Sequence, residues 1–169
     1  MERCISEDRI KHMHSVAELM KSAASDFDCS LGNSEIYILG LLHDIGYLGG
    51  KEDHERYGSS ILSKFLQGGS ENVIAQCICW HGITPLDYMK MCQCDIDGIP
   101  NELILLWWAD MMVESSGNEA GKVVGFTRRL NSIERRYGKD SKAYLICEET
   151  IMWLNNVIDR SLERKWMDI

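Results

Sequence analysis

Apolar residues recur along most of this chain at the three- and four-residue spacing of one helical face. Leu130, Ile133 and Tyr137 share one such face, and Leu154 and Ile158 share another. Strand-like alternation is nearly absent, so we expect an all-α fold in the form of a compact helical bundle. The pattern predicts a Gly-rich turn at 46–51, a long loop at 82–100, and helices over 6–25, 33–45, 53–67, 70–81, 101–115, 119–137 and 140–165.

Length and composition are those of an ordinary globular domain. The chain has 169 residues, 45% of them hydrophobic and 26% charged, so we expect one domain over residues 1–169. Its formal charge of −8 argues against binding of long nucleic acid or an anionic membrane. We find neither a signal peptide nor a membrane span, and we expect a cytoplasmic protein. A homo-oligomer is left open.

Seven cysteines are a high and odd number for a chain of this length. Because nothing suggests secretion, we interpret them as reduced thiols. The pairs Cys77/Cys79 and Cys92/Cys94 offer four thiolates for a structural zinc ion, but one intervening residue is fewer than zinc sites usually have. We favour the interpretation that these cysteines are small apolar residues of a core.

Two carboxylates interrupt apolar runs. Asp44 follows His43 at the end of the run 36–42, and Asp110 lies within the run 103–113. A buried carboxylate is costly unless a cation, hydrogen bonds or a proton compensates for the lost water. An arginine of the next helix is one candidate partner for Asp110. A metal is the other, and imidazole beside carboxylate is a suitable ligand pair for a divalent transition metal.

Three further histidines are candidates to complete such a site. His12 lies in the first expected helix, His54 opens the third, and His81 ends the fourth. Gly58 follows His54 by one turn on the same face, which suggests a crowded pocket. Each histidine also has a simpler explanation: His12 and His54 as structural or solvated side chains, and His81 as a partner of the helix dipole.

In combination these features resemble the HD-domain superfamily of metal-dependent phosphohydrolases, over nearly the whole chain. The matching motifs are Arg-x-x-His-x-x-x-Val-Ala at 9–17, Leu-Leu-His-Asp-Ile-Gly at 41–46, and an aspartate after alanine late in an apolar helix, at Asp110. The resemblance implies an HD-type helical bundle. It also implies four ligands for a divalent metal, which are His12, His43, Asp44 and Asp110.

Members of this superfamily with two metals carry two more histidines, which His54 and His81 match here, with Asp44 as the bridging ligand. The chain is most similar to small stand-alone bacterial members, which often carry His-Asp-Ile-Gly-Tyr, as at 43–47, and a late Arg-Tyr-Gly, as at 136–138. The resemblance therefore implies one or two ions. Imidazole and carboxylate ligands suit iron, manganese, nickel, cobalt or zinc.

Two positions depart from the superfamily pattern. The lysine that follows His-Asp-Ile-Gly in many phosphohydrolases is Tyr47 here, and Lys51 is the candidate replacement. The double histidine of cyclic-dinucleotide phosphodiesterases is Trp80-His81 here, which argues against hydrolysis of cyclic di-GMP.

The resemblance implies a phosphohydrolase that cleaves a phosphate ester or anhydride of a small molecule, with a nucleotide as the favoured substrate. His43 and Asp44 would be catalytic because they hold the metal whose bound hydroxide attacks phosphorus. A phosphate also needs cationic donors. The candidates are Lys51, Arg128 and Arg129, with Arg135 and Arg136 as weaker ones.

Other interpretations stay open at this point. A solvated helix face explains the arginines as well as a substrate role does. The same six ligands are also found in a minority branch of the superfamily, the di-iron oxygenases. A third interpretation is a non-catalytic, metal-bound domain that senses a nucleotide or serves as a scaffold. We rank the hydrolase first, the oxygenase second and the sensor third.

Overall fold

The computed structural model describes residues 4–50, 53–64 and 69–158. The expected all-α fold is confirmed, since within these residues the only β-structure is one isolated bridge between Val113 and Val123. None of the described helices has the length and apolarity needed to cross a membrane. The α-helices are α1 (Glu7–Ala23), α2 (Asn33–Leu42), α3 (His54–Leu62), α4 (Gly69–Trp80), α5 (Pro85–Cys92), α6 (Asn101–Met112), α7 (Phe126–Tyr137) and α8 (Lys142–Val157).

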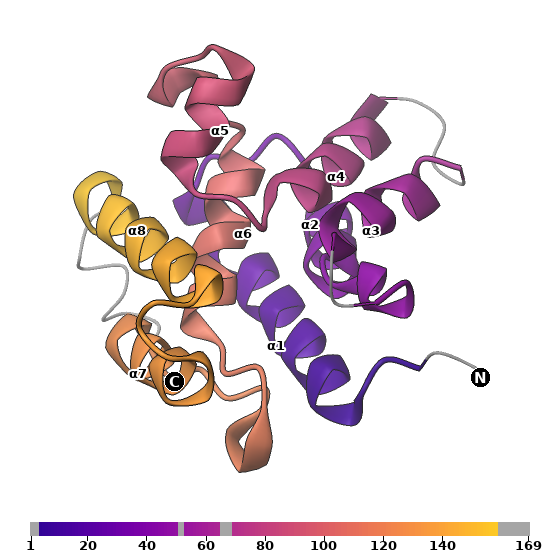
Figure 1. The fold of residues 1–169 in the computed structure, drawn as a ribbon. Coiled ribbons are helices and arrows are strands. Elements are labelled where there is room, and N and C mark those ends of the chain that lie inside the picture. Colours follow the sequence, from indigo (N-terminus) through magenta and orange to yellow (C-terminus); the bar gives the residue numbers. More distant parts are fainter. Residues whose placement is uncertain (1–3, 51–52, 65–68, 159–169) are drawn as a thin grey trace.

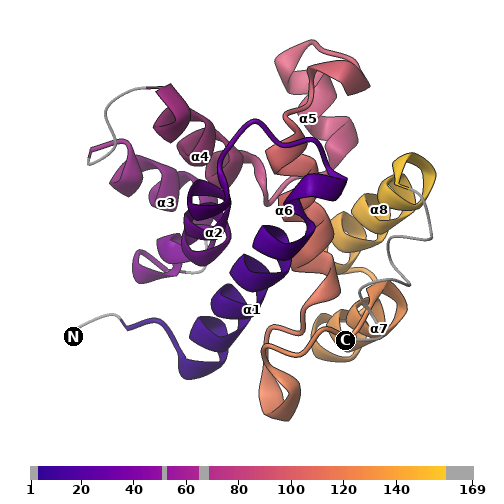
Figure 2. The ribbon, with the colours of Figure 1, turned by 180° about the vertical axis from the view of Figure 1, so that it is seen from behind.

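Helices α1 and α6 lie side by side in the middle of the molecule, and the other helices cover them in two groups (Figure 1). Helices α2, α3 and α4 pack on one side, α7 and α8 pack on the other, and α5 lies at one end. The view from behind shows the same arrangement (Figure 2). Residues of α1 and α6 that point toward α2–α4 therefore meet in the interior.

Helix α6 is the most deeply buried element of the core. Leu105, Leu106, Trp108 and Ala109 are all fully buried. A helix that is apolar on every face gains most by exchanging water for protein on every face, which explains its central position. Asp110 is carried into the interior by these neighbours.

The N-terminal end of α6 is tied to the loop before α2 by one carboxylate. Glu102 is only 3% exposed, and its Oε1 accepts hydrogen bonds from the Ser30 amide at 2.6 Å, the Ser30 hydroxyl at 2.7 Å and the Leu31 amide at 3.1 Å. Burial by itself raises the pKa of Glu102, but these hydrogen bonds lower it below the ordinary value. Glu102 is therefore a buried anion that links two distant parts of the chain.

The expected loop at 82–100 is wrong in one respect, because it contains helix α5. Pro85 stands at the first helical position, and the Thr84 hydroxyl accepts a hydrogen bond from the Asp87 amide at 3.1 Å. Proline at this position and threonine at the N-cap are the residue types that start a helix. Thr84 and Pro85 are therefore a local start signal for α5 within the segment expected to be a loop.

The expected helix over 119–137 begins later, at Phe126. Residues 121–124 turn back instead and bond to the end of α6. The Gly121 amide donates to the Glu114 carbonyl at 2.8 Å, and the Val124 amide donates to the Met112 carbonyl at 2.7 Å. These groups are therefore committed to a hairpin-like contact that a local helical pattern cannot reveal.

Two other expected boundaries shift. The turn expected at 46–51 is a short 3₁₀-helix, η2 (Ile45–Leu48). Helix α2 ends at Leu42, so His43 is its C-cap residue. Parts of the expected helices at 65–67 and 159–165 lie outside the described residues.

Candidate metal centre

The helices bring a histidine and an aspartate from α1 and α6 into direct proximity. His12 is fully buried on α1, and its Nε2 lies 2.9 Å from Oδ1 of Asp110 on α6. Both residues face the interior because their helices run side by side there. This contact joins parts of the chain that are about a hundred residues apart.

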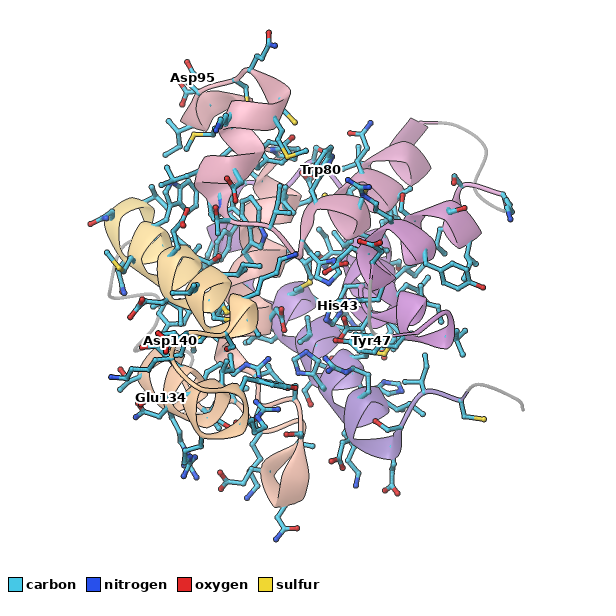
Figure 3. All side chains as sticks on the ribbon, viewed as in Figure 1. His43, Tyr47, Trp80, Asp95, Glu134 and Asp140 are labelled. Atoms are coloured by element: carbon cyan, nitrogen blue, oxygen red, sulfur yellow. The ribbon has the colours of Figure 1, made fainter. Side chains whose placement is uncertain are left out.

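Asp44 lies between four histidines. Its Oδ1 is 3.3 Å from Nε2 of His54 and 3.6 Å from Nε2 of His81. Its Oδ2 is 3.3 Å from Nε2 of His43 and 4.0 Å from Nε2 of His12. The six residues expected as ligands are thus gathered around one point, near the middle of the molecule where Figure 3 labels His43. Both oxygens of Asp44 face imidazoles, as a bridging carboxylate requires.

Two close approaches of the backbone position these side chains. A Cβ at Gly40 would lie 2.6 Å from the Cα of Ala17, so only glycine allows α2 to pack this closely on α1. The rings of His12 and His43 are consequently 5.4 Å apart, centroid to centroid. A Cβ at Gly46 would lie 1.6 Å from the carbonyl oxygen of His54, which brings the start of α3 against η2.

Backbone carbonyls orient two of the histidines. Nδ1 of His43 is 2.7 Å from the carbonyl oxygen of Gly40, and Nδ1 of His81 is 2.8 Å from that of Ile78. A carbonyl only accepts hydrogen bonds, so each Nδ1 carries the proton that it donates. Each Nε2 then points at Asp44 and is the ring nitrogen available to a metal.

The backbone of His81 is fixed as well. The indole Nε1 of Trp107 donates to the His81 carbonyl at 3.0 Å. Trp107 lies on α6, three residues before Asp110. The loop after α4 is therefore attached to the same helix that carries Asp110.

The electrostatics favour a cation in the middle of this cluster. Burial raises the pKa of Asp44, but His43 and Arg9 more than reverse this and hold it well below the usual range. Burial likewise opposes ionisation of Asp110, yet the neighbouring His12 ring keeps its pKa low. Both carboxylates are therefore anionic at neutral pH.

The two imidazoles nearest these carboxylates respond differently. Burial lowers the pKa of His12, which favours the neutral ring that binds metals. Burial also lowers the pKa of His43, but the charge of Asp44 outweighs it, so the pKa of His43 is raised. The environment of His43 thus stabilises a positive charge at its Nε2. Either a proton or a bound metal ion provides such a charge.

The donor atoms form two overlapping metal-sized groups. In each group the ligand atoms all lie within 4.8 Å of one another, and His43 belongs to both. One group is His12, His43 and Asp110, and the other is His43, Asp44 and His81. Neither Nε2 of His12 nor Nε2 of His43 makes a well-aligned hydrogen bond to any residue that the structure describes. Buried nitrogen atoms with open lone pairs beside carboxylates fit a divalent transition metal.

A cavity of about 190 Å³ opens beside this cluster. Four of the candidate ligands contribute to its wall, which are Asp44, His54, His81 and Asp110. Three arginines contribute the opposite charge, which are Arg9, Arg129 and Arg136. The cavity therefore combines metal-ligating groups with cations suited to phosphate.

Two of these arginines were not expected to be main phosphate contacts: Arg9 was not a candidate, and Arg136 was a weaker one. Arg9 Nη1 donates to Asp44 Oδ2 at 2.5 Å, and its guanidinium lies 4.3 Å from the ring centre of Tyr47. Arg136 lies on α7 and donates to Oε1 of Glu114 at 3.0 Å. Arg9 precedes His12 by three residues and thus shares its helical face, a signal that was available. The position of Arg136 depends on the packing of α7, which gave no local signal.

Of the three residues expected to contact phosphate, one lines the cavity, one does not, and one is not described by the structure. Arg129 lines the cavity, with Nη2 3.7 Å from Oδ1 of Asp110. Arg128 does not line it; this residue is exposed and pairs with Glu119 at the surface. Lys51 lies outside the described residues. Neighbouring positions on a helix point about 100° apart, which explains why Arg129 and Arg128 differ.

The cysteine pairs take no part in this cluster. Among the described residues, no group suited to a metal includes a cysteine. Cys77 is 1% exposed and packs in the hydrophobic core, where burial raises the pKa of its thiol. These observations agree with its interpretation as a small apolar residue of the core. The same interpretation is wrong for Cys92, which is exposed at the end of α5.

Comparison with known proteins supplies the family. The model of the HD domain matches residues 9–110, from the arginine that contacts Asp44 to the aspartate that contacts His12. No curated protein and no solved structure matches the chain. The match covers more than half of the sequence and includes all six clustered residues. The chain therefore belongs to the HD-domain family, a superfamily of metal-dependent hydrolases.

Proposed function

We propose that this protein is a metal-dependent phosphohydrolase that cleaves a phosphate ester or anhydride of a small molecule, with a nucleotide as the favoured substrate. Its centre would hold one or two ions of iron, manganese, nickel, cobalt or zinc. The ligands would be His12, His43, Asp44, His54, His81 and Asp110.

One observation carries the proposal: imidazole nitrogens face carboxylate oxygens inside the protein. Nε2 of His43 and of His81 lie 3.3 Å and 3.6 Å from oxygens of Asp44, while Nδ1 of each ring donates to a carbonyl. Two acceptors at this distance repel each other unless a proton or a metal lies between them. Protons on several adjacent imidazoles would repel one another, whereas one divalent ion serves several ligands at once.

When bound, a divalent metal acts as a Lewis acid and lowers the pKa of a coordinated water. The protein's own groups have separate tasks. Asp44 and Asp110 are fixed as anions, and Arg9 and Arg129 lie at these carboxylates on the side of the cavity. Guanidinium donors there would stabilise the charge that accumulates on phosphoryl oxygens during the reaction.

The shape of the cavity supports a small substrate. Its volume of about 190 Å³ suits a phosphoryl group but is below the 300–1,000 Å³ of sites that enclose a whole small molecule. Ile133 and Ile146 form an apolar part of its wall. The formal charge of −8 is unfavourable for a long nucleic acid.

The test begins with metal analysis of the purified protein. The metal found is then used with a panel of phosphomonoesters, phosphodiesters and phosphoanhydrides. Asp44→Ala should abolish metal-dependent hydrolysis while the helical circular dichroism stays unchanged. His14→Ala is the matched control, because His14 is exposed on α1 only two residues after His12.

The outcomes separate the three functions. Hydrolysis that requires metal and Asp44 supports the proposal. Oxygen consumption with a substrate, by an iron-containing protein that cleaves no phosphate compound, would replace the hydrolase with an oxygenase. Tight nucleotide binding without turnover under any metal would indicate a sensor.

A further inference from the structure

A second cavity, of about 420 Å³, adjoins the cavity beside the metal centre and shares part of its wall. The residues shared by the two walls are Arg9, Tyr47, Ser115, Arg136 and Tyr137. We call this second cavity the outer subsite. Tyr47, one of the shared residues, is labelled in Figure 3, and its ring centre lies 4.2 Å from that of His54. A substrate whose phosphoryl group occupies the inner cavity would therefore extend into the outer subsite.

Two serine hydroxyls in the outer subsite are prepared to donate to an anion. Oγ of Ser115 accepts from Arg129 at 2.8 Å and from Arg136 at 3.2 Å, and Oγ of Ser116 accepts from Arg136 at 2.5 Å. Neither hydroxyl donates to an acceptor within the part of the chain that the structure describes. A hydroxyl that accepts from a guanidinium keeps its own proton for another partner, and the adjacent positive charge makes that proton a stronger donor.

The arginines that polarise these serines are held in place from behind. Glu114 is 4% exposed, and its Oε1 accepts from Nη1 of Arg129 at 3.2 Å and from Nη2 of Arg136 at 3.0 Å. Arg136 Nε also donates to the Ser132 carbonyl at 3.2 Å. Because these bonds fix the guanidinium groups before any ligand arrives, little conformational freedom is lost on binding.

The charges at the wall of the outer subsite suit an anion. Arg9 and Arg136 are its cations, and Asp8 is its carboxylate. An Asp8 oxygen already accepts the Gly117 amide at 2.8 Å, which draws its charge toward the backbone of the Ser116 loop. The Cζ atom of Arg9 lies 4.3 Å from the centre of the Tyr47 ring, and its Nη1 pairs with Asp44, so this cation is held between the two cavities.

We propose that the outer subsite binds a second phosphoryl group of the substrate, through the hydroxyls of Ser115 and Ser116 and the guanidinium of Arg136. The preferred substrate class is then a small-molecule diphosphate or oligophosphate, such as a nucleoside diphosphate, rather than a monophosphate. This inference rests on the proposed function, because it assumes that the first phosphoryl group lies at the metal centre.

The test measures binding of two probes to the metal-loaded protein by calorimetry. Methylenediphosphonate carries two phosphoryl-like groups and resists hydrolysis, and inorganic phosphate carries one. Ser116→Ala should weaken binding of the diphosphonate about tenfold, the effect expected for one hydrogen bond to a charged group. Binding of phosphate should change less than twofold, because Ser116 lines the outer subsite and not the inner cavity. Ser22→Ala, at an exposed serine of α1, is the matched control and should affect neither probe.

Chelation of the metal alone cannot produce this result, because it would be the same in the wild type and in Ser116→Ala. An equal loss of affinity for both probes, or no loss for the diphosphonate, would overturn the outer subsite. If phosphate still binds and monoesters are still cleaved in that case, the proposed function stands without it. If neither probe binds and no phosphate compound is cleaved with any metal, both proposals fail together.

Discussion

Arg9 donates to Oδ2 of Asp44 at 2.5 Å, so the guanidinium neutralises the same carboxylate that faces the histidines. Arg9 therefore competes electrostatically with a metal while it offers donors to a phosphate. We expect Arg9→Met to tighten Mn²⁺ binding about tenfold, because one positive charge next to the ion is removed. The same change should lower kcat/KM about 10- to 100-fold through the loss of a charged donor.

Calorimetry with Mn²⁺ and steady-state kinetics measure these opposite effects. Lys11→Met is the control, because Lys11 is an exposed cation on the same helix and pairs with Glu7. Weaker metal binding in Arg9→Met would mean that Arg9 supports the ligands instead of competing with the ion.

We expect His54 to determine whether the centre holds one ion or two. Its Nε2 lies 3.3 Å from Oδ1 of Asp44, on the opposite carboxylate oxygen from His43 and His12. We expect His54→Ala to reduce the bound metal from two ions per chain toward one, as measured by elemental analysis after dialysis. His14→Ala should keep the wild-type content. A wild-type protein that saturates at one ion would show that the centre is mononuclear.

Glu102 should make stability depend on acid pH. Its pKa is lower in the folded protein than in the unfolded chain, so its contribution is complete above the unfolded pKa of about 4.3. The contribution is lost as the pH falls through that value toward the folded pKa. We expect Glu102→Gln to lower the free energy of unfolding by about 1–3 kcal/mol at pH 7. The difference between the two proteins should shrink below pH ~4.3.

Urea denaturation at several pH values measures this difference directly. Glu7→Gln is a suitable control, because Glu7 is exposed and only pairs with Lys11 on the surface. A gap between wild type and Glu102→Gln that stays constant from pH 7 to pH 3 would contradict the role of the ionised carboxylate.

Glu114 should contribute more to the free energy of unfolding than Glu119, a partly exposed carboxylate that also pairs with an arginine. Removing Glu114 leaves Arg129, which is only 5% exposed, with the more distant carboxylate of Asp110 as its remaining counter-ion. We expect Glu114→Ala to cost about 3–5 kcal/mol in free energy of unfolding. Glu119→Ala removes the surface partner of Arg128 and should cost less than about 1 kcal/mol. Equal costs would show that Glu114 is not an effective counter-ion.

The helical fold could be predicted because its signals are local. Apolar spacing and capping residues act within one or two turns, and α6 is apolar on every face, so its burial follows from its composition. Helix α5 was missed although Thr84 and Pro85 carry a local start signal. The late start of α7 was beyond local reasoning, because residues 121–124 bond to the end of α6 instead.

Some residues of the candidate site also have a local signal in the sequence, and others do not. Asp44 and Asp110 stand out because each interrupts an apolar run, and a buried charge needs a partner. The pairing of Arg136 with Glu114 and Ser116 depends on how α7 packs against the segment after α6, which no spacing encodes. Arg128 and Arg129 are adjacent residues of the same type, so the sequence does not distinguish them. The rotation of the helix places Arg128 at the surface and Arg129 at the cavity.

The candidate ligands come from five separate segments, and the contact of His12 with Asp110 closes a loop of about a hundred residues. All seven cysteines are free, so no covalent link performs this task. A bound metal would cross-link α1 and α6 at a single point and so stabilise the folded chain. The chain would then loosen when the metal supply falls, because no disulfide is present to hold these helices together.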